Sequence, residues 1–453
     1  MSKGSACQPA VLVVATGVAC LAGFLFGYDN IVISGAIGFL AKKFHLDSAG
    51  IGWAAGCALV GCILGSALAG TAADRFGLQK ALYGCAACFA ISSLGVWMAG
   101  SFFQYVVWRI VGGVGIGAAS IVAPMYIAEI APARIRGRLV VCYQLGIVAG
   151  ILSAVYVNML IQRAGDTAWN IEHGWRWMFA VGILPACLFA MAILKSRESP
   201  RWLMKVGREQ EAEAVLVAIN GRPKAATEVS AIRGALAEEE GGVRELFAGP
   251  FRRALIVGAV LAAFSQASGI TSVLSFLPEV FKSAGQTAGD AFFQSVLVGA
   301  VNVICTIAAI WLVDRSGRRT LLLTGTGVQA VALASIGCLY RSNAHGLGVA
   351  VGIMTFVAGH AIGNGAVCWV VISEIFPNKV RGAAMSLATL ALWVSAYMAN
   401  QFFPVMQNRL GSGGTFFIFA GMAVLNFAFV LTVVPETGGY SLEQISRLWQ
   451  RER

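Results

Sequence analysis

The sequence has few charged residues and only one long polar segment. Asp, Glu, Lys and Arg make up 12% of its 453 residues, whereas 58% are hydrophobic, and the mean hydropathy is +0.75. A soluble globular domain carries about 25% charged residues, so this composition excludes a chain that mostly faces water. The one long polar stretch spans about residues 195–250.

Signatures of several enzyme classes are also missing. There is no HExxH zinc motif, no Walker phosphate-binding loop and no GxSxG nucleophile elbow. The glycine run GGVGIG at 112–117 lies inside an apolar segment, where close helix packing explains it better than a dinucleotide site. The eleven cysteines lie almost entirely in apolar segments, which is typical of small helix filler. We therefore expect no enzymatic activity, no metal and no cofactor.

Twelve apolar segments are long enough to cross a membrane, since a bilayer core of about 30 Å requires roughly 20 apolar residues in a helix. These segments lie near residues 11–40, 50–72, 80–100, 103–128, 138–162, 175–194, 251–281, 291–313, 320–340, 347–373, 383–407 and 414–434. The first, fourth and tenth are long enough to tilt or kink. We predict an all-α membrane protein with twelve transmembrane helices in contact with the lipid bilayer.

The basic residues predict the orientation. An even number of crossings places both termini on one side, and the loops and tails on that side hold most of the 33 Lys and Arg. Loops rich in Lys and Arg stay in the cytoplasm, so both termini are expected there. The net charge of +11 then reflects topology and anionic lipid rather than a nucleic-acid partner. Short tails, compact loops and the lack of any N-x-S/T glycosylation acceptor favour a bacterial inner membrane.

The chain repeats itself. EIAPARIRG at 129–137 returns as EIFPNKVRG at 374–382, and GTAADRFG at 70–77 returns as WLVDRSG at 311–317. Each motif falls in a short loop at a matching place, which indicates two six-helix halves with a solute site between them. The predicted domains are the N-terminal half 1–194, a cytoplasmic linker 195–250 with short amphipathic helices, the C-terminal half 251–434 and a cytoplasmic tail 435–453.

Six motifs carry a resemblance to a known family. In chain order they are GYDNIVISGA, the paired D-R-x-G, YIAEIAPARIRG, ESPRWL, SEIFPNKVRG and PETGG. With these motifs the chain resembles, over essentially its whole length, the sugar porter family of the major facilitator superfamily. That family includes bacterial sugar/proton symporters and facilitative glucose transporters. The resemblance implies the major facilitator fold, transport by alternating access and a chain that functions as a monomer.

The repeated motifs place paired charges in loops of both halves. In the family that this chain resembles, such residues link helix ends across the cytoplasmic face. One exposed ion pair contributes about 0–1 kcal/mol, so several together bias two states without locking either. The alternative is topology determination with static capping of loops. The predicted cytoplasmic gate comprises Asp74, Arg75, Glu129, Arg136, Asp314, Arg315, Glu374 and Arg381.

The two copies of the gate differ. The first continues as FGLQK and keeps only Lys80, whereas the second keeps both Arg318 and Arg319. We therefore expect a weaker latch in the N-terminal half. Residues 208–220 and 228–240 of the linker have the pattern of short amphipathic helices, which form either a solvated connection or a lid over the cytoplasmic mouth.

Two charged residues lie deep in predicted spans: Asp29 in the first and Arg109 in the fourth. Charges within the membrane face the bundle interior and mark ion or substrate pathways, so each is the expected partner of the other. A shift of 245 residues leads to Leu274 and Met354, which are apolar. The pair therefore belongs to one half only, and we predict that it couples transport to protons. A static buried ion pair is the alternative.

The resemblance also implies a sugar site, because relatives contact sugar through matching amide and aromatic residues. Several positions depart from the family pattern: Thr271 replaces an asparagine, Asn364 is added, and His360 stands where relatives often have an aromatic residue. His360 either pairs with a carboxylate or is a neutral buried histidine, and each amide has helix packing as its alternative role. The predicted substrate-binding residues are Phe26, Gln144, Gln266, Thr271, Asn302, His360, Asn364, Trp369 and Trp393.

These patterns together predict a proton-coupled symporter that imports a small polyhydroxylated solute, which is a sugar, cyclitol, polyol or sugar acid. One feature opposes coupling: some proton-coupled relatives carry a glutamate in the sixth span, where this chain has Gly182. An uncoupled facilitator of the same solutes is therefore the first alternative. A membrane solute sensor that does not transport is the second.

Overall fold

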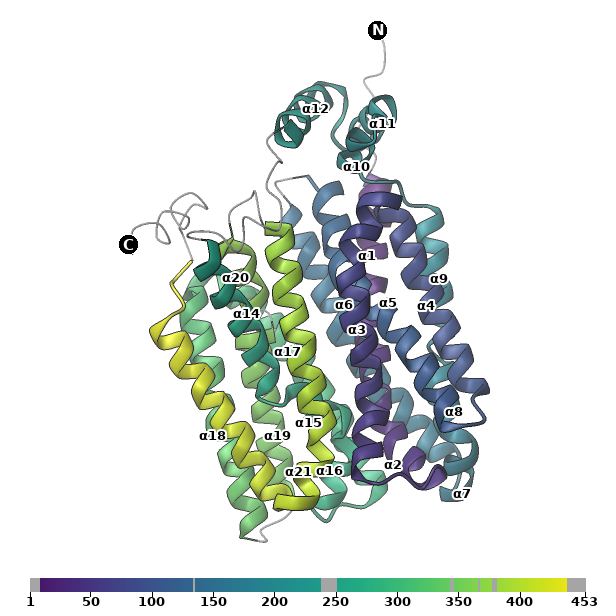
Figure 1. Ribbon diagram of the computed structural model, residues 1–453, viewed down its shortest axis with the longest axis vertical. Coiled ribbons are helices and arrows are strands. Elements are labelled where there is room, and N and C mark those ends of the chain that lie inside the picture. The colour runs from purple at the N-terminus through teal and green to yellow at the C-terminus, as the bar shows by residue number, and fades with distance from the viewer. Residues whose placement is uncertain are drawn as a thin grey trace.

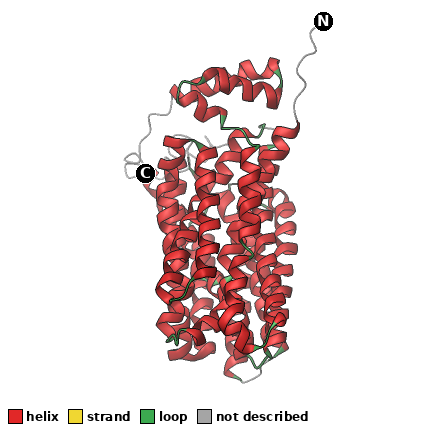
Figure 2. Cartoon of the chain, turned by 90° about the vertical axis from the view of Figure 1, so that its right-hand side faces the viewer, coloured by secondary structure: helices red, strands yellow, loops and turns green. Residues whose placement is uncertain are grey.

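The structure is a computed structural model that describes residues 9–132, 135–237, 251–342, 346–365, 367–376 and 381–437. Within these ranges every regular element is a helix, and the helices run almost parallel in one bundle (Figure 2). Two groups of helices lie side by side in it (Figure 1), one from each half of the chain.

The first group contains α1 to α9. Its helices are α1 (Pro9–Ile31), α2 (Ile33–Lys43), α3 (Ser48–Phe76), α4 (Leu78–Met98), α5 (Phe102–Ile130), α6 (Arg136–Ala164), α7 (Thr167–Trp169), the π-helix η1 (Asn170–Gly174), α8 (Trp175–Ala180) and α9 (Ile183–Leu194). Three short helices follow, α10 (Pro200–Lys205), α11 (Glu209–Asn220) and α12 (Arg222–Ala237). They lie across one end of the bundle (Figures 1 and 2), which we call the linker end.

The second group contains the remaining helices. They are α14 (Phe251–Ala267), α15 (Ile270–Ser275), α16 (Leu277–Ser283), α17 (Ala288–Ser316), α18 (Arg318–Arg341), α19 (Leu347–His360), the π-helix η2 (Ala361–Gly365), α20 (Val367–Ile375) and α21 (Arg381–Thr432). Across the two groups α3 packs against α21 and α6 against α17.

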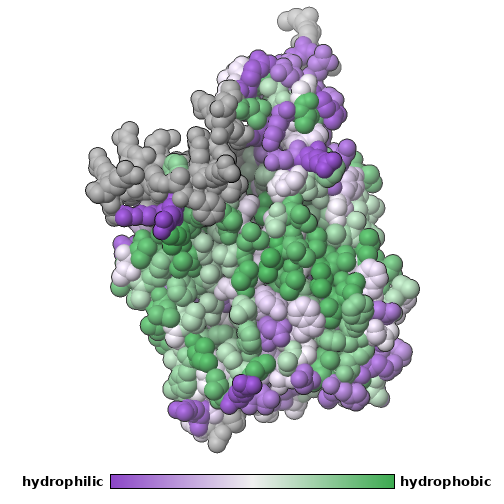
Figure 3. All heavy atoms as spheres, viewed as in Figure 1, coloured by the Kyte–Doolittle hydropathy of each residue, from purple (hydrophilic) through white to green (hydrophobic). Residues whose placement is uncertain are grey.

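Eleven helical segments of the described chain are long and apolar enough to cross a membrane. The last of them, Gly382–Thr432, contains Gly411 with a φ of 70° and a non-helical backbone. Figure 1 shows α21 turning back there, so it crosses twice and the crossings number twelve. On the face seen in Figure 3 a mostly hydrophobic surface lies between polar ends, as a surface in contact with lipid requires.

The first crossing of each half is broken, and an asparagine from a neighbouring helix braces each break. In the first half α1 ends at Ile31 and α2 begins at Ile33, and the Asn158 side-chain amide donates to the Val32 carbonyl at 3.1 Å. In the second half the Asn400 amide donates to Ser275 Oγ at 3.4 Å, just before the break at Phe276. The duplication thus preserves both breaks and the asparagine beside each; Asn158 satisfies freed backbone, whereas Asn400 binds a side-chain hydroxyl.

Glycines allow the helices of the first half to approach closely. A Cβ added at Gly113 of α5 would lie 1.9 Å from the Ala58 carbonyl oxygen of α3. A Cβ at Gly61 of α3 would lie 2.1 Å from the Ile110 carbonyl oxygen of α5. Small residues at membrane helix interfaces permit this backbone contact, which explains the glycine run of residues 112–117 and fixes the position of Arg109 on α5.

Candidate functional site

An ion pair lies inside the first half. Arg109 Nη1 of α5 donates to Asp29 Oδ1 of α1 at 2.9 Å, and Arg109 Nη2 donates to the Asp29 carbonyl oxygen at 3.0 Å. The two side chains are only 1% and 7% exposed, respectively. The Arg109 guanidinium also lies over the ring of Phe179 of α8, with 5.0 Å between its central carbon and the ring centroid. The structure thus brings together the two predicted proton-coupling residues.

One oxygen of the Asp29 carboxylate is left without a partner. Asp29 Oδ2 is buried and accepts no hydrogen bond from the part of the chain that the structure describes, and the same holds for Ser92 Oγ on α4. Both oxygens lie close to Gly112, because a Cβ added there would lie 3.1 Å from Asp29 Oδ2 and 2.4 Å from Ser92 Oγ. A buried carboxylate with an unpaired oxygen is poorly solvated.

The second half has no matching pair. Leu274 is buried in α15 and Met354 is partly buried in α19, at the positions that correspond to Asp29 and Arg109. Within the described ranges, moreover, no three His, Cys, Asp or Glu side chains come together as a metal site would require. Among the described residues, the charged side chains that are buried are those of Asp29 and Arg109, and both lie in the first half.

The predicted substrate residues lie on helices of both halves. Phe26 of α1 and Trp393 of α21 meet across the halves with ring centroids 5.6 Å apart. Thr271 of α15 donates its hydroxyl to Gln266 Oε1 of α14 at 2.6 Å. The indole nitrogen of Trp393 is buried and makes no hydrogen bond. An aromatic pair beside buried donors and acceptors suits the two kinds of surface on a sugar-like solute.

The other predicted residues are not joined to this pair by hydrogen bonds. Gln144 of α6, Asn302 of α17 and Trp369 of α20 make no side-chain hydrogen bond within the described part of the chain. Asn302 is buried, whereas Gln144 and Trp369 are partly buried. The structure therefore leaves their polar groups available to a ligand without bringing them into one network.

Buried polar side-chain atoms lie on η2 and on the helices α18, α19 and α21 near it. Asn426 of α21 donates to Asn364 Oδ1 at 3.5 Å, while Asn364 Nδ2 and Asn426 Oδ1 are buried without partners. His360 Nδ1 and both polar side-chain atoms of Gln329 on α18 are likewise buried and unpaired. Sequence analysis identified His360 and Asn364 but missed Asn426 and Gln329. Their only signal was a polar residue within an apolar span.

The predicted gate residues are only partly brought together. Asp74 pairs with Lys205 of α10 at 2.8 Å, and the Ser199 hydroxyl donates to Glu129. In the second half Arg318 pairs with Glu374 at 3.4 Å. The Arg75 and Arg315 guanidinium groups lie over the rings of Phe76 and Trp311, and the side chains of Arg136, Asp314 and Arg381 lie outside the described residues.

Two glutamates that sequence analysis assigned to motifs but not to the site cap matching helices. Glu198 accepts hydrogen bonds from the backbone of Leu78 and Gln79, at 3.0 and 3.1 Å, at the start of α4. Glu436 accepts from the backbone of Arg318 and Arg319, at 2.9 and 3.0 Å, at the start of α18. A carboxylate at a helix N-terminus satisfies free N–H groups and complements the helix dipole. The two glutamates are nearly 240 residues apart, close to the offset of the repeated motifs, and this spacing could have identified them in the sequence as a matching pair.

In the first gate copy the neutral residue Gln79 stands at the position that Arg319 occupies in the second copy. Gln79 Nε2 donates to the carbonyl oxygens of Ser196 and Ile193, at 2.9 and 3.2 Å. At the matching place in the second half, Arg319 Nη2 donates to the Leu431 carbonyl. Gln79 thus preserves the contact to the neighbouring chain but removes a positive charge.

The end of the bundle opposite the linker helices joins the two halves directly. Gln401 Nε2 of α21 donates to the Ala49 carbonyl of α3 at 3.2 Å, and Asn408 Nδ2 donates to Ser48 Oγ at 3.1 Å. A Cβ added at Gly52 would lie 2.2 Å from the Gln401 carbonyl oxygen. The halves are therefore in close contact at this end.

Comparisons with known proteins give the chain its relatives. The family model described as "Sugar (and other) transporter" matches residues 15–449. The chain is 39% identical over 431 residues to the arabinose-proton symporter of Bacillus subtilis, covering 95% of this chain and 93% of that protein. It is 38% identical over 470 residues to the D-xylose-proton symporter of Escherichia coli K12, covering 96% and 95%.

A solved structure supports the same assignment. The partially occluded inward-open conformation of the xylose transporter XylE from E. coli matches with a TM-score of 0.87 and 35% identity, over 95% of this chain and 100% of that chain. These findings confirm the predicted fold of twelve helices in two halves. They also confirm that the chain is not an enzyme, because the matching proteins are transporters.

Proposed function

Because the chain belongs to the sugar transporter family, we propose that it is a proton-coupled symporter that imports a small polyhydroxylated solute by alternating access. The observation that carries the coupling is the buried pair of Asp29 and Arg109, which is 2.9 Å long and occurs in one half only. The two relatives are named as proton symporters of arabinose and xylose, which supports the same role for this chain.

Asp29 is the proton-binding group of this proposal. Its carboxylate uses only Oδ1 to bind Arg109, so Oδ2 is the oxygen at which a proton binds. Protonation neutralises the carboxylate and removes the counter-charge of a buried guanidinium. Loss of one partner of a buried pair costs about 3–5 kcal/mol, which approaches the roughly 5.5 kcal/mol that moves a two-state equilibrium from 1:99 to 99:1. Arg109 keeps its bond to the Asp29 carbonyl and its contact with Phe179 in either state.

The solute binds between the halves in this proposal. Phe26 and Trp393 present apolar faces from opposite halves. The unpaired polar atoms of His360, Asn364 and Trp393 supply hydrogen bonds to ring hydroxyls. Burial of these polar groups without hydrogen-bond partners destabilises the empty site. A polyhydroxylated solute carries enough hydroxyl donors and acceptors to bind them. This supports a sugar, cyclitol, polyol or sugar acid.

Alternating access requires that the two ends open in turn. The end opposite the linker helices is held closed by contacts such as that of Gln401 with Ala49, and the overall fold is similar to an inward-open transporter. The exposed pair of Asp74 with Lys205 and the partly buried pair of Glu374 with Arg318 form the breakable latch at the linker end in this proposal. We assign that end and both termini to the cytoplasm of a bacterial inner membrane, and the monomer as the working unit.

The direct test is proton movement driven by solute. The purified chain is reconstituted in liposomes that contain a pH-sensitive dye, and D-xylose, L-arabinose, D-glucose, myo-inositol, xylitol and gluconate are added in turn. For the correct solute we expect uptake together with acidification of the lumen, at about one proton per solute. Uptake without proton movement would show the facilitator alternative, and binding without uptake would show the sensor.

A further inference from the structure

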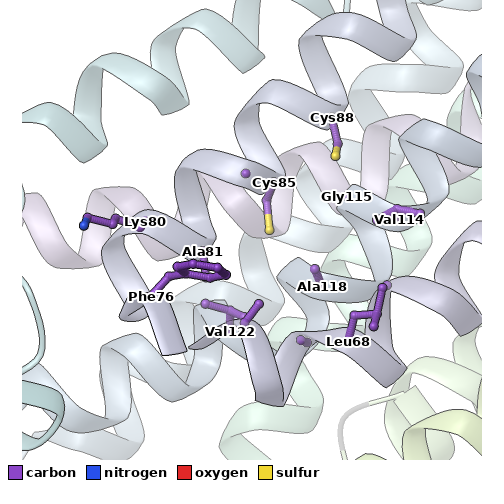
Figure 4. Close-up of a pocket in the computed structure, with 14 residues that line it drawn as sticks. Leu68, Phe76, Lys80, Ala81, Cys85, Cys88, Val114, Gly115, Ala118 and Val122 are labelled. Atoms are coloured by element: carbon purple, nitrogen blue, oxygen red, sulfur yellow. The ribbon is translucent and has the colours of Figure 1, made fainter. Parts of the chain in front are cut away.

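A narrow groove crosses the lipid-facing side of the first half, away from the candidate site. It has a volume of about 330 Å³ and lies between α3, α4 and α5. Ala69, Gly115 and Ala118 are among the buried or partly buried small residues of its lining, whereas Gly84, Leu68 and Phe76 line it and are exposed. Figure 4 shows Lys80 at one end of the groove, with its ammonium group pointing away, and Cys88 toward the other.

The length of the groove matches one leaflet of a bilayer. Its lining residues on α3 run from Gly65 to Phe76, a helix length of about 16 Å at 1.5 Å per residue. The hydrocarbon core of a bilayer is about 30 Å thick, so the groove spans one acyl layer. It is open to the outside, since Leu68 is 61% and Phe76 52% exposed. Nothing lies within 4 Å of a Cβ added at Gly84.

Positive charge gathers where the groove meets the linker end. Lys80 lines the groove there, and Arg75 lies one residue before Phe76, with its guanidinium over the Phe76 ring at 5.4 Å. Neither Lys80 nor Arg75 makes an ion pair within the described residues. The carboxylates beside them are already engaged: Asp74 pairs with Lys205, and Glu198 binds the backbone at the start of α4. The two cations are therefore not neutralised by the protein.

From this geometry we propose that the groove is a binding site for one phospholipid with an anionic headgroup. An acyl chain lies along the floor between α3, α4 and α5, and the phosphate binds Lys80 and Arg75. A free phosphate is not the proposed occupant. It would bind the two cations but would leave the apolar lining of the groove uncovered. The acyl chain packs on α5 at Gly115 and Ala118, less than three turns from Arg109.

Native mass spectrometry of the intact chain with phosphatidylglycerol or phosphatidylcholine tests the acyl part of the site. Gly84→Leu adds a bulky side chain to the lining of the groove at a position where nothing lies within 4 Å of an added Cβ, and leucine favours a helix over glycine. Gly70→Leu is the matched control, because Gly70 of α3 also has nothing within 4 Å of its added Cβ but does not line the groove. We expect Gly84→Leu to lose the tightly retained phosphatidylglycerol, while Gly70→Leu keeps it.

Charge variants test the headgroup part. One basic residue near an anionic lipid surface changes affinity roughly fivefold. We expect Lys80→Gln to lower retention of phosphatidylglycerol by about that factor and to leave phosphatidylcholine unchanged, while Lys80→Arg and the exposed linker variant Lys224→Gln behave as wild type. Equal retention by wild type and Gly84→Leu would overturn the site. A dimer of the wild-type chain that Gly84→Leu dissociates and Gly70→Leu does not would also overturn the site, because a second copy of the chain would then occupy the groove.

Discussion

Replacing Asp29 by asparagine separates coupling from transport. The carboxamide has nearly the shape of the carboxylate, and its oxygen can still accept from Arg109 Nη1, which lies 2.9 Å from Asp29 Oδ1. Arg109 also keeps its bond to the Asp29 carbonyl at 3.0 Å. The variant should therefore fold, with a free energy of unfolding lowered by at most about 3–5 kcal/mol, because the buried guanidinium loses its counter-charge. It can no longer bind or release a proton.

The size of the effect follows from the proton gradient. One pH unit across the membrane is worth about 1.4 kcal/mol per proton, and 1.4 kcal/mol is a factor of ten in a concentration ratio. With one proton per solute, wild type should accumulate solute about tenfold at a gradient of one pH unit. Asp29→Asn should reach equal concentrations inside and outside, while counterflow exchange of labelled solute continues.

The assay is accumulation of labelled solute in liposomes at gradients of zero, one and two pH units. Asp47→Asn is a matched control, since Asp47 is exposed and its side chain only caps α3 through the Gly50 backbone N–H at 2.8 Å. Asparagine is an equally good cap, so this variant should accumulate like wild type. Accumulation by Asp29→Asn that still rises tenfold per pH unit would refute Asp29 as the coupling group.

Three further changes probe other parts of the structure. Gly112→Ala should reduce proton-driven accumulation more than downhill exchange, because its methyl group would lie 3.1 Å from Asp29 Oδ2. The same methyl group would lie 2.4 Å from Ser92 Oγ, so adding Ser92→Ala, which removes that oxygen, should restore part of the lost accumulation. Trp393→Phe should raise KM about fivefold at an unchanged melting temperature, as expected for one lost hydrogen bond to solute; an unchanged KM would contradict that role. Glu436→Gln should speed amide hydrogen exchange at the start of α18 at least tenfold, since bonds to a charged acceptor contribute about 1.5–3 kcal/mol; protected amides would show that the cap is dispensable.

The sequence determined the membrane architecture, because each crossing is a local property. An apolar run of about 20 residues specifies a spanning helix without reference to the rest of the chain. The repeated motifs specified two halves, and even the turn at Gly411 lies in the gap between two predicted spans. The rarity of intramembrane charge likewise singled out Asp29 and Arg109 before any contact was known.

Partners were harder to predict, because they depend on how helices distant in the sequence approach. Composition gave no reason for Asp74 to pair with Lys205 across 131 residues, or for Glu198 to cap the start of α4. Nor did the sequence reveal that Asn426 reaches Asn364, because a lone amide in an apolar span is equally compatible with simple packing.

Local pattern therefore fixed where the chain crosses the membrane, how it is duplicated and which charges are buried. Only the tertiary structure decided which oxygen of Asp29 is left unpaired, which aromatic rings meet across the halves and where the lipid-facing side is hollowed. The physical reason is that burial and periodicity act over a few turns of one helix, whereas hydrogen bonds and grooves are set by angstrom-scale distances between helices.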